Sequence, residues 1–509
     1  ETKYEQGQRY AISQDLYIMQ KIIEIINGIT RHPNYRLSTP VNFTLERGEH
    51  LAVYGKNGSG KSLFIDILTG AHPLLGESLT YNFSKCMSHC NKENIRYITF
   101  RDVYGNQEPS YYQQRWNQAD EAIFPTVRDV LMSLSNPNIK FADMADNEIL
   151  AQTGLLEHLY KPINRLSSGE LRRLQLAKTL LGNPQLLIID NPYIGLDVTA
   201  RENLTNILSN LSKRLTIIVV VSRCEDIAPF IRQVLTIKNK KVCEKLPRKN
   251  FLAKRENEVS VLIASFTLPA SETSPNYSSE TIIDFQDINI RYGKRTILKD
   301  FNWQVKRGEH WALTGQNGAG KSTLLSLICA DNPMAYACNI TLFGKRRGQG
   351  ESIWDIKKHI GYVSPEIFTA YKKSLPAIDI VCSGLRDTIG LYKQSTPQER
   401  EKCNGWLKVF GIEDLSERNY LTLSSGEQRL ILLVRAFVKN PQLLILDEPF
   451  HGLDDYYRKL AKDIIDQYMK DTSKTLIMVS HYAEEFPTCI NRHLHLEKQA
   501  DGFELSVVH

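Results

Sequence analysis

The sequence predicts an α/β fold that is built twice in tandem, and three observations support this prediction. The first is an internal repeat, in which three short motifs return in the same order in the second half of the 509 residues. The second is a set of short, almost wholly aliphatic runs, which suit parallel strands that are covered on both faces. The third is the alternation of such runs with helical patterns. Together they indicate a duplicated α/β domain.

The repeat is visible in the letters of the sequence. Each half contains a glycine-rich octapeptide, a serine- and glycine-containing pentapeptide, and an aliphatic run that ends in an aspartate. They are GKNGSGKS (55–62) and GQNGAGKS (315–322), LSSGE (166–170 and 423–427), and NPQLLIID and NPQLLILD, which end at Asp190 and Asp447. Three motifs at nearly constant spacing are the mark of a duplicated domain.

The length suits two domains joined by a linker. We expect an N-terminal extension at 1–20, a first domain at 21–245, a linker at 246–280 and a second domain at 281–509. The linker is predicted because polar residues, Ser, Thr and Pro gather there. Residues 238–255 hold eight basic side chains against one acid, Glu244. This basic stretch is either a solvated strand and loop or a contact for phospholipid headgroups or nucleic acid.

Composition bounds the kind of partner. With 63 Lys and Arg against 57 Asp and Glu, the net charge of +6 is too mild to indicate nucleic-acid binding by itself. The longest apolar run, 215–221, is far shorter than the roughly 20 residues of a spanning helix. The first thirty residues lack the pattern of a secretory signal, and the nine cysteines are scattered. We therefore expect a cytoplasmic location, either free or peripheral on the cytoplasmic face of a membrane.

The octapeptides predict two ATP sites. Their glycines let backbone N–H groups turn towards phosphate oxygens at a helix N-terminus. Lys61 and Lys321 are expected to reach the β- and γ-phosphates, while Mg²⁺ is expected at Ser62 and Ser322 together with Asp190 and Asp447. The predicted ATP-binding residues of the two loops are Gly55, Asn57, Gly58, Gly60, Lys61, Ser62 and Leu63, and Gly315, Asn317, Gly318, Gly320, Lys321, Ser322 and Thr323.

The pentapeptide LSSGE resembles the signature of the ATP-binding-cassette (ABC) family, whose usual form is LSGGQ. The resemblance covers essentially the whole chain outside the linker and the N-terminal extension. It implies ATP hydrolysis and, in each half, a mostly parallel core sheet, an antiparallel subdomain and a helical subdomain. It also implies that each ATP is clamped between one P-loop and the other half's signature. Because both P-loops and both signatures lie on one chain, we expect this clamp to form within a monomeric chain. The signature residues are Ser167, Ser168, Gly169 and Glu170, and Ser424, Ser425, Gly426 and Glu427. A helix-capping box is the alternative interpretation of LSSGE.

Further residues match the family in the same register. Tyr292 resembles the aromatic residue that stacks on adenine. The first half offers His32 in that register, with Tyr35 nearby, and an ordinary core or surface tyrosine is the alternative interpretation of Tyr35. The Gly-Leu-Asp triplets that end at Asp197 and Asp454 resemble the family's D-loop.

The two halves differ where the family performs its chemistry. In the second half, Glu448 directly follows the metal aspartate, and His481 follows the next aliphatic run. Glu448 is predicted to be the base that polarises the attacking water, and His481 to contact the γ-phosphate. In the first half these positions are Asn191, an amide that cannot accept a proton, and Arg223. We therefore expect one hydrolytic site and one degenerate site.

The resemblance suggests a role in transport. The tandem form resembles fused cassette proteins linked to molybdenum transport and photorepair, which implies the energising subunit of a transporter with a separate permease. The family's coupling glutamine is absent in register, and Gln107 or Glu366 are its candidate substitutes. The alternatives are a soluble regulatory ATPase that acts on ribosomes or DNA, and a nucleotide-gated scaffold with negligible turnover.

Overall fold

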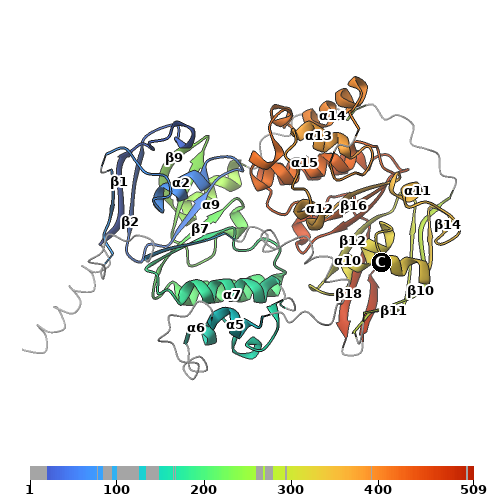
Figure 1. Ribbon diagram of the computed structural model, residues 1–509, viewed down its shortest axis with the longest axis horizontal. Coiled ribbons are helices and arrows are strands. Elements are labelled where there is room, and N and C mark those ends of the chain that lie inside the picture. The colour runs from blue at the N-terminus through green and yellow to red at the C-terminus, as the bar shows by residue number, and fades with distance from the viewer. Residues whose placement is uncertain are drawn as a thin grey trace, which may run out of the picture. The chain divides into compact units, whose positions relative to one another are not determined.

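The computed structural model of the chain describes residues 20–76, 78–83, 94–99, 125–132, 148–163, 166, 168–258, 268–269, 279–292, 295–390, 393–499 and 502–508. The chain divides into two compact units, Glu1–Leu262 and Ile263–His509, and each unit holds one copy of the repeat (Figure 1).

The first unit alternates strands and helices in the way that the sequence predicts. Its elements are β1 (Lys21–Gly28), β2 (Val41–Glu46), β3 (Leu51–Tyr54), α2 (Lys61–Leu68), β4 (Leu79–Tyr81), β5 (Ile95–Thr99), α5 (Val127–Met132), α6 (Glu148–Gln152), α7 (Ser168–Leu180), β6 (Leu186–Asp190), α8 (Val198–Leu211), β7 (Thr216–Val221), β8 (Gln233–Lys238), β9 (Lys241–Pro247) and α9 (Arg248–Glu258).

The second unit repeats this order with longer strands at its start. Its elements are β10 (Thr281–Tyr292), β11 (Arg295–Lys306), β12 (His310–Gly315), α10 (Lys321–Ile328), β13 (Asn339–Leu342), β14 (Lys345–Arg346), α11 (Ile353–Lys357), β15 (Ile360–Val363), α12 (Pro365–Ala370), α13 (Ala377–Ser383), α14 (Pro397–Val409), α15 (Ser425–Phe437), β16 (Leu443–Asp447), α16 (Asp455–Tyr468), β17 (Thr475–Val479), β18 (Arg492–Gln499) and β19 (Gly502–Val508).

A six-stranded sheet forms the core of each unit. The strand orders are β5-β6-β7-β3-β8-β9 and β15-β16-β17-β12-β18-β19, so equivalent strands have equivalent neighbours. Neighbouring strands are parallel except for the hairpins β8–β9 and β18–β19. The predicted aliphatic runs form β6, β7, β16 and β17, and every residue of these strands is buried. The predicted duplicated α/β fold with mostly parallel sheets is confirmed.

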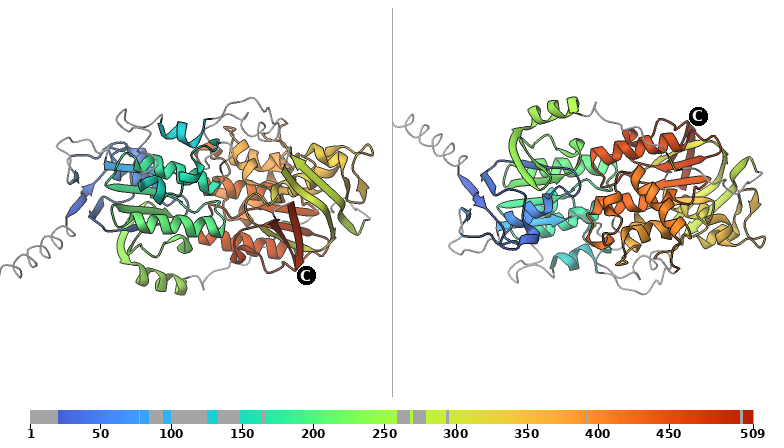
Figure 2. Two further views of the ribbon diagram at one scale, coloured as in Figure 1. Left: turned by 90° about the horizontal axis from the view of Figure 1, so that it is seen from below. Right: turned by 90° about the horizontal axis from the view of Figure 1, so that it is seen from above.

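Each unit adds an antiparallel sheet and a group of helices. The antiparallel sheets are β2-β1-β4 and β11-β10-β13-β14. In the second unit α13, α14 and α15 pack around buried side chains such as Ile380, Trp406 and Leu433. Figures 1 and 2 show these helices and the antiparallel sheet in separate places beside the central sheet. In the first unit α5, α6 and α7 share a smaller apolar cluster.

The structure has a helix where the sequence predicted the start of the linker. Strand β9 continues to Pro247, and α9 follows directly at Arg248–Glu258. Figure 2 shows α9, in yellow-green, at the periphery of the first unit. Phe251 anchors this helix, because its ring is 3% exposed and meets the ring of Tyr54 edge-on at 5.0 Å. The sequence pattern missed α9 because its few apolar side chains stand among basic ones, which leaves little periodicity.

Candidate functional site

Both phosphate loops connect the P-loop strand of a central sheet to a helix, β3 to α2 and β12 to α10. Glycine is required at several of their positions. Gly60 and Gly320 have φ angles of 101° and 92°, a region that side chains rarely enter. A Cβ on Gly315 would lie 2.4 Å from the carbonyl oxygen of Leu496. The loops therefore present bare backbone at a helix N-terminus, where N–H groups can approach an anion.

The lysine at the start of each helix folds back onto its own loop. The Nζ of Lys61 donates to the carbonyls of Gly55, at 2.7 Å, and of Lys56, at 3.0 Å. Lys321 makes the equivalent bonds at 2.6 and 3.0 Å. Phosphate oxygens bound along the loop could replace these carbonyls as partners. The other predicted residues of the loops and of the first helical turns are Asn57, Gly58, Ser62, Leu63, Asn317, Gly318, Ser322 and Thr323.

The second signature lies at the N-terminus of α15. The hydroxyl of Ser424 accepts from the backbone N–H of Glu427, and the carboxylate of Glu427 accepts from the backbone N–H of Ser424 at 2.7 Å. The capping box that the sequence left as an alternative is therefore present. It is compatible with anion binding, because it fixes the helix end at which Ser425 and Gly426 stand.

The first signature begins α7, with Gly169 and Glu170 in its first turn. Glu170 forms an ion pair with Lys161 at 2.6 Å and lies 3.5 Å from His158. Ser167 and the side chain of Ser168 lie outside the residues that the structure describes. The D-loop aspartates, Asp197 and Asp454, each cap the helix that follows them.

The strand ends of the second unit bring two carboxylates and a histidine together. Asp447 ends β16, and Glu448 follows with a φ of 47°, a strained conformation of the kind found at functional sites. Its Oε1 lies 3.0 Å from Nε2 of His481. Burial, together with the charges of Glu448 and Glu366, raises the pKa of Asp447 to about 8. Burial also opposes the ionisation of Glu448, but the hydrogen bond from His481 and nearby positive charges outweigh it and lower the pKa of Glu448.

A second histidine near Glu448 was not singled out from the sequence. Nδ1 of His451 lies 3.9 Å from Oε2 of Glu448. Arg429, on α15, donates from Nη1 to this same ring nitrogen at 3.1 Å. Its guanidinium carbon also lies 4.3 Å from the ring centroid of Phe368, on α12. Because an arginine cannot accept a hydrogen bond, Nδ1 of His451 is the acceptor. Arg429 thereby orients the imidazole beside the carboxylate.

The equivalent strand end of the first unit has different chemistry. Asn191 stands where Glu448 stands, and its Nδ2 donates to Oδ1 of Asp190 at 2.7 Å. The hydroxyl of Tyr97, on β5, donates to Oδ2 of the same aspartate at 3.2 Å. Both carboxylate oxygens of Asp190 thus accept hydrogen bonds from the protein itself.

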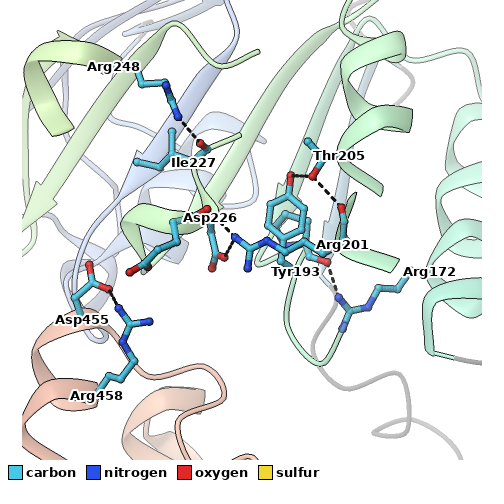
Figure 3. Close-up of polar contacts among 11 residues, drawn as sticks. Arg172, Tyr193, Arg201, Thr205, Asp226, Ile227, Arg248, Asp455 and Arg458 are labelled. Atoms are coloured by element: carbon cyan, nitrogen blue, oxygen red, sulfur yellow. Dashed lines mark hydrogen bonds and ion pairs between the residues drawn. The ribbon is translucent and has the colours of Figure 1, made fainter. Parts of the chain in front are cut away.

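The position of His481 is taken in the first unit by Arg223, a buried residue whose charge acts on the carboxylate of Asp226. Figure 3 shows Asp226 together with its ion-pair partner Arg201. Arg201 forms an ion pair with Asp226 at 2.8 Å, and its guanidinium lies 4.8 Å from the ring centroid of Tyr193. Burial raises the pKa of Asp226, while the charges of Arg201 and Arg223 oppose that rise. Two guanidinium groups therefore face one buried carboxylate.

The aromatic candidates for adenine lie on the antiparallel sheets or beside them. The ring of Tyr35 stacks on that of His72, with centroids 4.1 Å apart and planes at 8°. His32 lies 5.0 Å from Tyr35. Tyr292 ends β10, but its side chain lies outside the described residues.

Of the two candidate substitutes for the coupling glutamine, the structure describes one. Glu366 lies in the first turn of α12, and its charge contributes to the raised pKa of Asp447. Its carboxylate therefore faces the same strand end. Gln107 lies outside the described residues.

Each unit has a P-loop beside a strand that ends in an aspartate, and a signature at the start of a helix. This arrangement, present twice in tandem, defines a duplicated P-loop ATPase. The chain belongs to the ABC transporter family, whose sequence profile matches residues 38–194 and 298–451. It therefore binds ATP, and ATP hydrolysis is the general reaction of this family.

Two relatives agree with this assignment, and a solved structure shares the fold. The chain is 34% identical to the ABC transporter ATP-binding protein ModF of Escherichia coli, over 93% of this chain and 96% of ModF. It is 33% identical to an uncharacterized ABC transporter ATP-binding protein of Schizosaccharomyces pombe, over 94% and 98% of the two chains. An archaeal ribosome recycling factor, aABCE1, solved in complex with a ribosomal stalk protein, shares the fold with a TM-score of 0.55 at 18% identity, over 94% of this chain and 89% of that one.

The helices in the described part of the chain are too short or too polar to cross a bilayer.

Proposed function

We propose that the two cassettes are functionally unequal and that ATP is hydrolysed at the site that contains Glu448. The observation that carries this proposal is the contrast between two equivalent side chains. Glu448 is an ionised carboxylate 3.0 Å from His481, and such a group accepts a proton from an attacking water. Asn191 is a neutral amide that donates to Asp190 instead. The base is expected to contribute about 10²–10⁴-fold to turnover.

The second site suits Mg²⁺. Ser322 and Asp447 would hold the ion. The fit rests on charge, because Asp447, Glu448 and Glu366 face one another around a single P-loop lysine, Lys321. A divalent cation would offset this repulsion and would neutralise charge on the β- and γ-phosphates. Glu448 then orients and deprotonates the water, and His481 holds the carboxylate in place.

Catalysis requires the two halves to meet. The second P-loop and Glu448 close on the first signature, Ser167–Glu170, and the first P-loop closes on Ser424–Glu427. In each pair the N-terminus of α7 or α15 supplies N–H groups and a positive dipole end for the γ-phosphate. The first site holds ATP without appreciable turnover, since Asn191 cannot serve as a base.

This ATPase energises a transporter whose permease is a separate chain, from a position on the cytoplasmic face of the membrane. The support is the relative ModF, whose name assigns it to an ABC transporter and which aligns over nearly the whole chain. A soluble regulatory ATPase on ribosomes is the alternative.

Fractionation of native cells separates the two roles. We expect native membranes to retain the protein after a wash with about 0.5 M salt, in which surface charge contacts are screened within a few ångströms. Complete release by that wash, together with recovery in the ribosomal pellet, would contradict the transport role. If the membranes retain the protein, a pull-down from detergent-solubilised membranes identifies the permease.

A further inference from the structure

Strand pairing places Arg223 at the edge of the sheet that carries the first phosphate loop. Arg223 follows the end of β7, which lies beside β3, the strand that leads into the loop. Val221 and Tyr54, the last residues of these two strands, are register partners. The hydroxyl of Ser222 then donates to Oδ1 of Asn57 in the loop at 3.4 Å. Because Arg223 is the next residue, its backbone is fixed beside the loop.

The surroundings of Arg223 allow its guanidinium to leave Asp226 for another anion. Arg223 is 8% exposed, and its charge acts on the buried carboxylate of Asp226. A buried carboxylate is costly without a positive partner. Arg201 already supplies one, because it forms an ion pair with Asp226 at 2.8 Å and donates to the carbonyl of Glu225 at 2.6 Å (Figure 3). Asp226 therefore keeps a partner when Arg223 turns towards a bound phosphate.

Three equivalent positions make the first site more positive than the second. One lies in the phosphate loop, one directly follows the aspartate that ends a strand, and one follows the neighbouring strand. The pairs, with the first unit named first, are Lys56 and Gln316, Asn191 and Glu448, and Arg223 and His481. ATP carries one more phosphoryl group than ADP and therefore more negative charge. A site with this excess of positive charge favours the triphosphate.

Arginine is the side chain best suited to a terminal phosphate. Its planar guanidinium can donate two parallel hydrogen bonds to phosphate oxygens, and it stays charged at every physiological pH. It is also longer than histidine, so from the position of His481 it can extend further over the loop. These properties distinguish Arg223 from the residue at the same place in the second unit.

We propose that Arg223 makes the first cassette select ATP over ADP, by binding the γ-phosphate through its guanidinium. The inference rests on the proposed function, in which the first cassette holds ATP without appreciable turnover, and it names the side chain that holds the terminal phosphate. Asn191 leaves that phosphate intact because it cannot activate a water. ADP lacks the phosphate and is held without this contact, so the first cassette binds it more weakly than ATP.

The test measures the first site alone in the full chain. Lys321→Ala disables the second phosphate loop and serves as the background. The affinities for AMP-PNP, an ATP analogue that is not hydrolysed, and for ADP are measured by calorimetry in the presence of Mg²⁺. Adding Arg223→Gln should weaken binding of AMP-PNP by about tenfold or more, the size of a charge-assisted contact. It should change the affinity for ADP by less than about threefold. Arg223→Lys keeps the charge and should recover part of the loss.

Two control variants separate phosphate binding from a structural role. Asp226→Asn breaks the same contact from its other end. It should leave the ratio of the two affinities unchanged or raise it, because the guanidinium of Arg223 is then free of its competitor. Arg232→Gln removes an exposed arginine at the opposite edge of the sheet, where its N–H donates to the carbonyl of His50 at the start of β3. It should change neither affinity.

The outcomes distinguish failure of the inference from failure of the proposed function. Equal weakening of AMP-PNP and ADP by Arg223→Gln, or no weakening of either, would overturn the γ-phosphate contact while the first cassette remains a nucleotide site. A ratio that Asp226→Asn lowers as far as Arg223→Gln does would assign the effect to the ion cluster and would also overturn it. If folded Lys321→Ala, checked by circular dichroism, binds neither nucleotide, the nucleotide role of the first cassette fails, and the inference fails with it.

Discussion

Asn191 and Glu448 share one backbone conformation and differ only in what their side chains can do. Their φ angles are 51° and 47°. Each backbone N–H donates to a carbonyl near the end of the neighbouring strand, that of Asn191 to Val220 at 2.9 Å and that of Glu448 to Val479 at 3.0 Å. Asparagine tolerates this left-handed conformation better than most residues, whereas glutamate is strained in it. The backbone strain therefore occurs in the unit that has a carboxylate at this position.

The first prediction is asymmetric catalysis. Glu448→Gln keeps the size of the side chain but removes the proton acceptor, so steady-state phosphate release should fall at least about 100-fold. Asn191→Ala removes no base and should change turnover by less than about threefold. Equal losses from the two substitutions would contradict the assignment of hydrolysis to the second P-loop.

The second prediction concerns His451 as a positioning residue. His451→Ala removes the ring that Arg429 orients beside Glu448, so kcat should fall by roughly tenfold. The KM for ATP should stay nearly constant, because the phosphate loop is untouched. His451→Asn should restore part of the activity, since an amide oxygen can accept from Arg429.

The matched control for this prediction is the equivalent residue of the first unit. Ile194 is as far along the chain from the end of β6 as His451 is from the end of β16, and it follows Asn191 where His451 follows Glu448. Ile194→Ala should leave kcat unchanged. A fall in kcat that is the same for both alanine variants would indicate a general loss of structure instead of a local role for His451.

Local patterns account for most of what the sequence predicted correctly. Runs such as Ile217–Val221 are aliphatic throughout because they are buried on both sides, and Gly315 is a glycine because Leu496 leaves no room for a side chain. The contacts that distinguish the two sites lie between distant segments. Tyr97 and Asp190 are 93 residues apart in sequence, and their hydrogen bond depends on the pairing of β5 with β6. No local pattern contains that information.

The third prediction concerns α9, which the sequence assigned to the linker. Phe251→Ala removes the ring that packs on Tyr54 and should lower the free energy of unfolding of the first unit by about 3–5 kcal/mol. Lys249→Ala, exposed on the same helix, should change it by less than about 0.5 kcal/mol. Denaturant unfolding of the full chain measures both, and limited proteolysis reports the site of opening. If Phe251→Ala matched Lys249→Ala in stability, α9 would behave as part of the linker.

The last prediction concerns closure of the two cassettes around ATP. Both P-loops and both signatures lie on one chain, and a short tether gives the halves an effective concentration of roughly millimolar order. Closure should therefore occur within one chain and outcompete association between chains at micromolar protein. The Glu448→Gln variant traps the ATP-bound state because it binds but does not hydrolyse. With ATP it should show a smaller radius of gyration by small-angle scattering, at a molar mass by light scattering that remains that of one chain. Adding Lys321→Ala removes the P-loop lysine that faces Glu448 and should abolish the compaction. A doubling of the molar mass on addition of ATP would show instead that each chain closes against a second copy.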